Sequence, residues 1–157
     1  MKLGTKGRYA VTAMVDLATH SDKGPVALSD IALRQNLPIQ YLEQLFAKLR
    51  KAELVVSVRG QRGGYTLNLK ADEIRVADII LAVDELLQTT ACRPASTRSC
   101  HGGHGRCLTH NLWEGLEHHI MYYLRSISLE DVCLKRIMSN GARLSPHERD
   151  LYDVSNA

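Results

Sequence analysis

The chain has 157 residues, of which 45% are hydrophobic and 24% charged, a composition typical of a soluble globular protein. This length accommodates one ordinary hydrophobic core with room for one appended module. No apolar run approaches the roughly 18 residues that a membrane-spanning helix needs, so we expect no membrane contact. We therefore expect a cytoplasmic protein, in which thiols stay reduced and can bind metal.

The formal net charge of +3 is unevenly distributed along the sequence. Residues 1–70 carry 11 Lys and Arg against 5 Asp and Glu, whereas residues 71–157 carry 9 against 12. A basic amino-terminal half joined to an acidic half indicates a polyanion-binding face on one module only. An ordinary solvated surface is the alternative, which charge alone does not exclude.

Apolar residues at helical spacing predict three helices in the basic half. The first begins at residue 5 or 6 and ends at residue 20, and the third covers about residues 39–52. Between them a short helix is expected after Ser29, a residue type that caps helix amino termini well. Its side chains expected to face inward are Ile31, Ala32 and Leu33.

The third predicted helix has two distinct faces. Its apolar face comprises Leu42, Leu45, Phe46 and Leu49. Its polar face comprises Gln40, Glu43, Gln44, Ala47 and Lys51, flanked by Lys48 and Arg50. Two short helices joined by a tight turn, the second presenting amides and bases, describe a helix-turn-helix. Gln44 could pair with an adenine edge, and Glu43 could select sites by accepting from cytosine or by penalising wrong bases. A solvated helix face is the alternative.

A β-hairpin is predicted next. Apolar residues alternate with a period of two over residues 54–59, residues 60–64 are rich in glycine and form the turn, and residues 65–67 form the second strand. Glycine lets the backbone approach phosphates closely, and an arginine at the tip can enter a narrow minor groove. A helix-turn-helix followed by a basic hairpin is a winged helix, which is typical of DNA binding. The residues expected to contact DNA are Lys6, Arg8, Gln40, Tyr41, Glu43, Gln44, Lys48, Arg50, Lys51, Ser57, Arg59 and Arg62.

The segment 90–110 has no helical or strand period and holds three of the four cysteines. Three thiols and an imidazole supply enough ligands for an iron–sulfur cluster or a structural zinc. The spacing Cys-x7-Cys-x6-Cys-x2-His lacks the short Cys knuckles of zinc modules, and therefore favours a cluster. His101 and His104 also lie in this segment and compete with His110 as the fourth ligand. Cys133 lies outside it, at a position expected to be buried.

The acidic half contains two further helical patterns. The first, about residues 76–86, is expected to link the winged helix to the cysteine-rich segment. The second, residues 110–127, carries a broad apolar stripe that a two-fold dimer would cover, although packing within one chain is the alternative. A dimer would place two third helices on a pseudo-palindromic DNA site. Capping boxes at Ser128-x-x-Asp131 and Ser145-x-x-Glu148 predict short helices that follow.

Three strings carry a resemblance to a known family. They are GRYAVTAMVDLA at residues 7–18, YLEQLFAKLRKAELVVSVRGQRGGY at residues 41–65, and CLTH at residues 107–110. Together they resemble the IscR family, the iron–sulfur cluster regulators of bacteria, over most of residues 1–127. The resemblance implies a homodimeric winged-helix transcription factor, not an enzyme. It would sense a [2Fe–2S] cluster and repress cluster-assembly genes, with activation of other genes as a further implied role.

The resemblance also implies the ligand set Cys92, Cys100, Cys107 and His110. Both gaps between the cysteines are longer than the family pattern by one or two residues, and related regulators hold a [4Fe–4S] cluster with three cysteines. A [4Fe–4S] cluster or zinc, with nitric oxide or iron as the signal, therefore stays an alternative. The cluster-assembly machinery is the expected donor. An iron–sulfur enzyme or electron carrier is disfavoured, because no catalytic triad, paired carboxylates or nucleotide-binding glycine motif is visible.

The predicted fold class is mainly α with a small β-hairpin wing, a winged helix-turn-helix plus a long dimerisation helix. Five regions are expected. They are a DNA-binding domain at 1–70, a connecting helix at 71–89, a cluster-binding loop at 90–110, dimerisation helices at 111–138 and a carboxy-terminal tail at 139–157.

Overall fold

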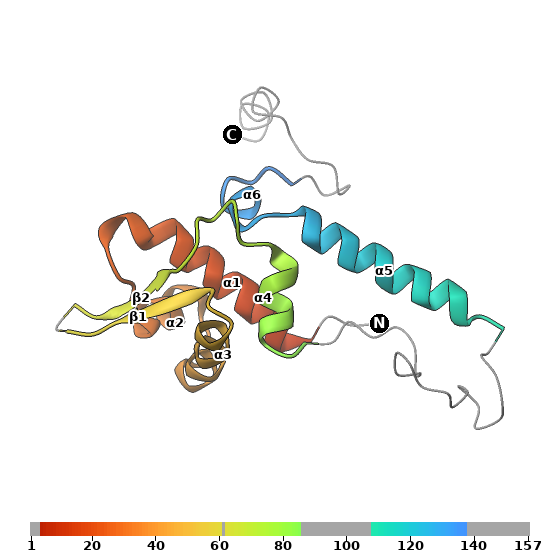
Figure 1. Cartoon of the computed structure of the whole chain (residues 1–157). Helices are drawn as coiled ribbons and strands as arrows, with labels where there is room; N and C mark the ends of the chain where they lie inside the picture. The colour runs from red at the N-terminus through yellow and green to blue at the C-terminus, as the bar shows by residue number, and fades with distance from the viewer. Residues whose placement is uncertain (1–3, 61, 86–107, 138–157) are drawn as a thin grey trace.

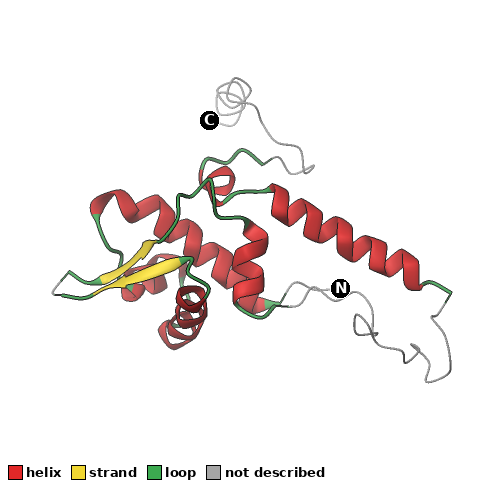
Figure 2. Cartoon of the chain, viewed as in Figure 1, coloured by secondary structure: helices red, strands yellow, loops and turns green. Residues whose placement is uncertain are grey.

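The computed structural model describes residues 4–60, 62–85 and 108–137 (Figure 1). Its elements in chain order are α1 (Thr5–His20), the short 3-10 helix η1 (Ser21–Lys23), α2 (Leu28–Gln35), α3 (Ile39–Lys51), β1 (Val55–Val58), β2 (Gly64–Leu67), α4 (Val76–Ala82), α5 (His110–Ser126) and α6 (Leu129–Cys133). Figure 2 shows mainly helices with one small hairpin in this part of the chain. The predicted fold class, mainly α with a β-hairpin wing, is confirmed.

Helix α1 lies at the centre of the fold, because α2, α3, α4 and α6 all pack against it. Its fully buried apolar side chains are Ala10, Ala13, Met14 and Leu17, and the two alanines let neighbouring helices approach closely. From α3, Phe46 closes the core beneath the hairpin, where its ring meets that of Tyr65 edge-on with centroids 4.9 Å apart. The residues expected to contact DNA therefore lie on elements that share one hydrophobic core.

The turn between α2 and α3 is tight, because Asn36 adopts a left-handed conformation with φ of 51°. The N–H groups of Asn36 and Leu37 both donate to the carbonyl of Ala32, which closes the end of α2. Pro38 follows as the N-cap of α3, and its carbonyl accepts from the N–H groups of Tyr41 and Leu42. The geometry is that of the predicted helix-turn-helix.

Two predictions for α2 are wrong. The N-cap is Ala27 rather than Ser29, and no side chain caps the helix; the Ala27 carbonyl accepts from the N–H groups of Asp30 and Ile31 instead. Leu33 is 84% exposed, whereas Ile31 is fully buried. The two side chains are about 200° apart around the helix, so both cannot face the core.

The hairpin pairs Val55 with Leu67 and Val58 with Gly64 in an antiparallel register. Its base is joined to the preceding loop by a reciprocal pair of backbone hydrogen bonds between Val26 and Tyr65, at 2.9 and 2.8 Å. Gly64 is required here, since a Cβ at this position would overlap the carbonyl of Val26. The wing is thus fixed to the helical core at its base, while its tip projects away from the core (Figure 1).

Helix α4 ends at Ala82, earlier than the predicted residue 86, and Asp84 follows with a left-handed φ of 55°. At the other end of α4, the Val76 N–H donates to the Ile127 carbonyl at 3.0 Å, and the Leu129 N–H donates to the Ile74 carbonyl at 2.8 Å. These bonds join the start of α4 to the segment that connects α5 to α6. From this junction α5 extends away from the other helices (Figure 1).

The predicted capping box at the start of α6 is confirmed. The Asp131 N–H donates to Ser128 Oγ at 3.1 Å, and the Ser128 N–H donates to Asp131 Oδ2 at 3.0 Å. The second predicted box, at Ser145 and Glu148, lies outside the described residues, as does the predicted tail. Across the described ranges, none of the helices combines the length and apolarity needed to cross a bilayer.

Candidate nucleic-acid interface and metal site

Helix α3 presents a polar face to solvent. Its buried side is formed by Leu42, Leu45, Phe46 and Leu49, each at most 3% exposed. On the opposite side Gln40, Glu43, Gln44, Ala47 and Lys51 are exposed, and Arg50 is exposed at its edge. An amide, a carboxylate and a second amide thus project from one exposed stripe, where they could meet base edges in a major groove.

The start of α1 lies beside the start of α3. A surface hollow between them is lined by Thr5, Tyr9, Pro38, Gln40, Tyr41 and Gln44. The rings of Tyr9 and Tyr41 meet edge-on with centroids 5.8 Å apart, and Lys6 and Arg8 are exposed on the first turn of α1. These two basic side chains could contact a phosphate, although the N-cap of α1 is already occupied, because the Gly4 N–H donates to Glu85 at 2.7 Å. Thr5 and Tyr9 were not among the predicted contacts, because only packing brings them beside α3.

Lys48 differs from the other basic residues of α3. It is half-buried, and its Nζ donates to Asp84 Oδ2 at 2.8 Å, beyond the end of α4. The hydrogen bond from Lys48 lowers the pKa of the Asp84 carboxyl, as do the positive charges of Lys48, Lys6 and Lys51. The structure therefore brings one carboxylate among three lysines that were predicted to contact phosphates.

The tip of the hairpin carries exposed basic and small side chains. Arg59, Arg62 and Ser57 are all exposed. Gly60 has a φ of 129°, which disfavours any other residue, and its carbonyl accepts from the Gly63 N–H at 2.9 Å. Arg59 therefore directly precedes this tight turn and Arg62 lies within it, at the tip of the wing.

His110 is the predicted metal ligand that the structure describes. It is the first residue of α5 and is only 8% exposed. Its Nε2 lies 3.8 Å from Glu114 Oε2, and its Nδ1 is buried with no hydrogen-bond partner among the described residues. A buried ring nitrogen without a partner is costly, and coordination by a metal would satisfy it.

The other ligand candidates lie outside the described residues: Cys92, Cys100, Cys107, His101 and His104. Within the described ranges, no group of three or more potential ligands comes together. A set of three thiolates and one imidazole suits an iron–sulfur cluster, and the unpaired nitrogen of His110 fits the fourth position of such a set. The residues present are therefore compatible with a cluster.

Cys133 in α6 packs against the core as expected, but it is half-buried rather than buried. Its Sγ donates to the Val15 carbonyl at 3.9 Å. Burial raises the pKa of its thiol, so it is a poorer nucleophile and a poorer metal ligand than an exposed cysteine. We therefore regard Cys133 as a packing residue.

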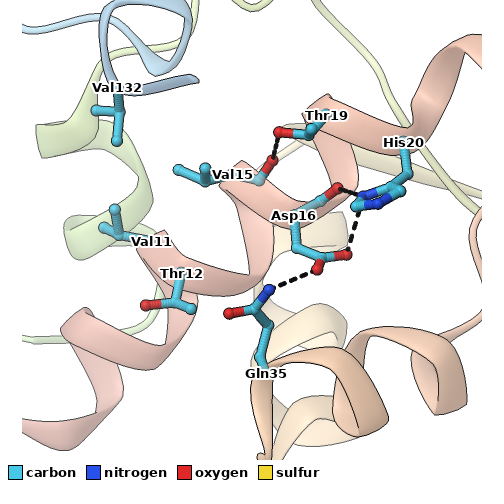
Figure 3. A pocket seen from close by; sticks show the side chains of 8 residues that line it. All are labelled: Val11, Thr12, Val15, Asp16, Thr19, His20, Gln35 and Val132. Carbon is cyan, nitrogen blue, oxygen red and sulfur yellow. Dashed lines mark hydrogen bonds and ion pairs between the residues drawn. The ribbon is translucent and has the colours of Figure 1, made fainter. Parts of the chain in front are cut away.

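A second hollow lies between α1, the end of α2 and α6, and Figure 3 shows its lining residues. Asp16 is buried at its floor. The Asp16 carboxylate accepts from Gln35 Nε2 at 2.7 Å and from Arg34 Nη2 at 2.6 Å, and His20 Nδ1 lies 3.5 Å from Oδ1. Burial raises the pKa of Asp16, but the hydrogen bonds from Arg34 and Gln35 outweigh this effect and lower it. Since the carboxylate is already satisfied, this hollow is structural.

The Rrf2 family, described as iron-dependent transcriptional regulators, matches residues 3–135 of this chain. The chain belongs to the Rrf2 family. It is 55% identical over 132 residues to the HTH-type transcriptional regulator IscR of Aliivibrio salmonicida, covering 84% of this chain and 77% of that protein.

Two solved structures of Rrf2-type size and fold are also similar. T. potens IscR has 42% identity and a TM-score of 0.68, with 84% of this chain and 85% of that chain covered. CymR, the global cysteine regulator of B. subtilis, has 34% identity and a TM-score of 0.70, with 85% and 96% covered. This Rrf2 protein is accordingly a DNA-binding transcription regulator with a winged-helix fold, and it is not an enzyme.

Proposed function

We propose that this Rrf2 protein senses an iron–sulfur cluster and regulates cluster-assembly genes, as a repressor of those genes and an activator of others. One observation carries the proposal: the buried Nδ1 of His110 has no partner in the described part of the chain, three residues after Cys107. Similarity to proteins named IscR supports the same assignment. The cluster-assembly machinery would supply the cluster.

The proposed ligands are Cys92, Cys100, Cys107 and His110, and the proposed group is a [2Fe–2S] cluster. When bound, such a cluster would supply redox and ligand-exchange chemistry that reports on iron, oxygen or nitric oxide. His110 must be neutral to bind, and it is the first residue of α5, where its ring is buried. Zinc or a [4Fe–4S] cluster on the same ligands is the second candidate.

We further propose that α5 forms a homodimer through its apolar stripe. Leu112 is 64% exposed and Trp113 42% exposed, and Leu116 and Tyr123 are exposed along the same helix. Exposed large apolar groups in a continuous stripe are typical of a subunit interface. A two-fold dimer would present two copies of α3 and the wing to a pseudo-palindromic operator, one half-site for each subunit.

A visible absorption spectrum of anaerobically purified protein, with iron and sulfide analysis, tests the cluster. A [2Fe–2S] cluster gives several visible bands and equal iron and sulfide, whereas zinc gives no bands. The variants Cys92→Ala, Cys100→Ala, Cys107→Ala and His110→Ala should each lose or alter the bands. Cys133→Ala, His101→Ala and His104→Ala serve as controls and should retain them. Unchanged spectra in all three loop-cysteine variants would refute the ligand assignment.

Light scattering of the Leu116→Glu variant tests the dimer. The charged side chain should convert the dimer to a monomer, because it would be buried without a partner. Asn111→Glu, at an exposed polar position near the start of the same helix, is the matched control and should remain a dimer. A dimer in both variants would contradict the assignment of the interface to the stripe.

A further inference from the structure

Asp84 lies where the end of α4 meets α1 and α3, the two helices that carry the predicted phosphate contacts. It follows α4, and Figure 1 shows that end of α4 beside the start of α1 and close to α3. Its carboxylate is 77% exposed and accepts from Lys48 Nζ at 2.8 Å. The next residue, Glu85, accepts from the Gly4 N–H at 2.7 Å, immediately before α1. Two consecutive acidic residues therefore contact both helices that carry the predicted phosphate contacts.

Hydrogen bonds fix the main chain of the turn that carries Asp84. The Asp84 N–H donates to the Leu81 carbonyl at 3.1 Å, and the Glu85 N–H donates to the Ile80 carbonyl at 3.3 Å. Together with the contact between Glu85 and Gly4, these bonds set the position of the Asp84 backbone beside α3. From there the carboxylate reaches a lysine that DNA phosphates would otherwise attract.

We propose that Asp84 is a built-in competitor for DNA phosphates: by pairing with Lys48 it withdraws one cation from the phosphate-binding face formed by α1 and α3. A carboxylate offers a lysine the same charge and the same oxygen acceptors as a phosphate. A lysine that is neutralised within the protein releases no counterion from DNA on binding. Lys48 is then not a phosphate contact, whereas Lys51, exposed one residue beyond Arg50, stays one.

The pair could instead be a simple structural link between α3 and α4, and the two roles differ in what they change. A structural link affects the free energy of unfolding. A competitor for phosphate affects the number of counterions released on DNA binding, which is measured as the slope of log K against log salt concentration. Each cation removed from the phosphate contacts flattens this slope by about 0.9.

The experiment uses the full chain and a fluorescein-labelled duplex of arbitrary sequence, with anisotropy measured over a series of NaCl concentrations. Four variants are compared with the unmodified chain: Lys48→Ala, Asp84→Asn, the double variant, and Lys51→Ala. Asparagine is chosen at position 84 because it tolerates the left-handed backbone there. Asp22→Asn, on η1 at the opposite end of α1 from Lys6, changes the net charge equally and is the control.

We expect Lys48→Ala to leave the slope unchanged and Asp84→Asn to steepen it by about 0.9, with tighter binding at low salt. The double variant should return to the original slope. Lys51→Ala should flatten the slope by about 0.9, and Asp22→Asn should leave it unchanged.

Two results would overturn the proposal. One is a slope flattened by about 0.9 in the single variant Lys48→Ala. That result would show that Lys48 leaves Asp84 and contacts DNA in the unmodified protein. The other is an unchanged slope in Asp84→Asn together with a lower melting temperature, which would identify the pair as a structural link only. The two single variants report independently, so a folding defect in one does not remove the test.

Discussion

The Nη2 atom of Arg34 lies 2.6 Å from Oδ1 of Asp16, and this contact fastens the helix before α3 to the buried centre of α1. The Asp16 side chain is fully buried, and Gln35 Nε2 donates to its other oxygen at 2.7 Å. Arg34 and Gln35 are the last two residues of α2, directly before the turn into α3. The pairing therefore fixes where the helix-turn-helix bends.

We expect Asp16→Asn to destabilise the protein by about 1.5–3 kcal/mol, because it removes the charge-assisted hydrogen bonds to Arg34 and leaves that cation without its partner. Urea denaturation followed by circular dichroism measures the change. Asp22→Asn removes an exposed acid of the same type and should change the free energy of unfolding little. Equal effects of both substitutions on the free energy of unfolding would show that the buried pair contributes no more stability than an exposed acid.

The same carboxylate predicts a pH dependence. The pKa of Asp16 is lowered in the folded state, because the bonds from Arg34 and Gln35 outweigh the opposing effect of burial. Its stabilising contribution is therefore complete above the unfolded pKa of about 3.9, and is lost as pH falls through the lower folded pKa. Urea melts at a series of pH values should show the difference between the original protein and Asp16→Asn shrinking below about pH 4. A constant difference down to pH 3 would contradict this.

Asn36 offers a test of the turn itself. Its φ of 51° is left-handed, a conformation that costs most non-glycine residues about 1–2 kcal/mol. Asn36→Ala should therefore destabilise the protein by about 1 kcal/mol, whereas Asn36→Gly should be neutral or slightly stabilising. Chemical denaturation compares the two variants directly. If alanine and glycine behaved alike, backbone conformation would not be what selects asparagine here.

Arg59 at the wing tip is predicted to contact DNA. Arg59→Ala should weaken binding and flatten the dependence of log K on log salt by about 0.9. Fluorescence anisotropy with a labelled duplex gives both quantities. Arg125→Ala, an arginine near the end of α5 far from the wing in sequence, is the control and should leave the slope unchanged. Identical slopes in all three proteins would remove the wing from the interface.

Glu43 is predicted to select DNA sequence rather than to add affinity, because a carboxylate repels phosphates but accepts from a cytosine amine. Glu43→Ala should therefore broaden the set of sites that survive selection from a random duplex library. Arg50→Ala is the comparison: as a predicted phosphate contact it should weaken binding uniformly across sequences. A uniform loss in Glu43→Ala as well would refute the selective role.

The helices could be predicted closely wherever their signal is local. The boundaries of α1, α3 and α5 lie within one residue of those expected, because apolar residues that recur at helical spacing mark a helix whether its apolar face is buried, as in α1 and α3, or exposed, as in α5. The burial of β1 is different: Leu54 and Val55 are buried, whereas Val56 and Val58 are exposed. The expected alternation does not correspond to one buried face, because the wing projects beyond the core and only its base is covered.

The pairs that connect separate elements could not be predicted. Asp16 and Arg34 are 18 residues apart, and Lys48 and Asp84 are 36 residues apart. Each residue alone reads as an ordinary charged position, and only packing decides which partner it meets. Lys48 is an example. The sequence predicted that it contacts phosphate with the other basic residues of α3, whereas in the structure it pairs with Asp84 beyond α4.

Main-chain hydrogen bonds join the start of α4 to the segment after α5, from Val76 to Ile127 and from Leu129 to Ile74, and the side chains of Val76, Ile80 and Ile127 form a buried cluster at the same place. Main-chain bonds do not depend on side-chain identity, so exposed positions of α5 such as Leu112 and Leu116 can change without loss of this junction, whereas Leu124 packs against its cluster. In the proposed dimer, the spacing of the two DNA-binding units would thus stay constant while the exposed positions of α5 change.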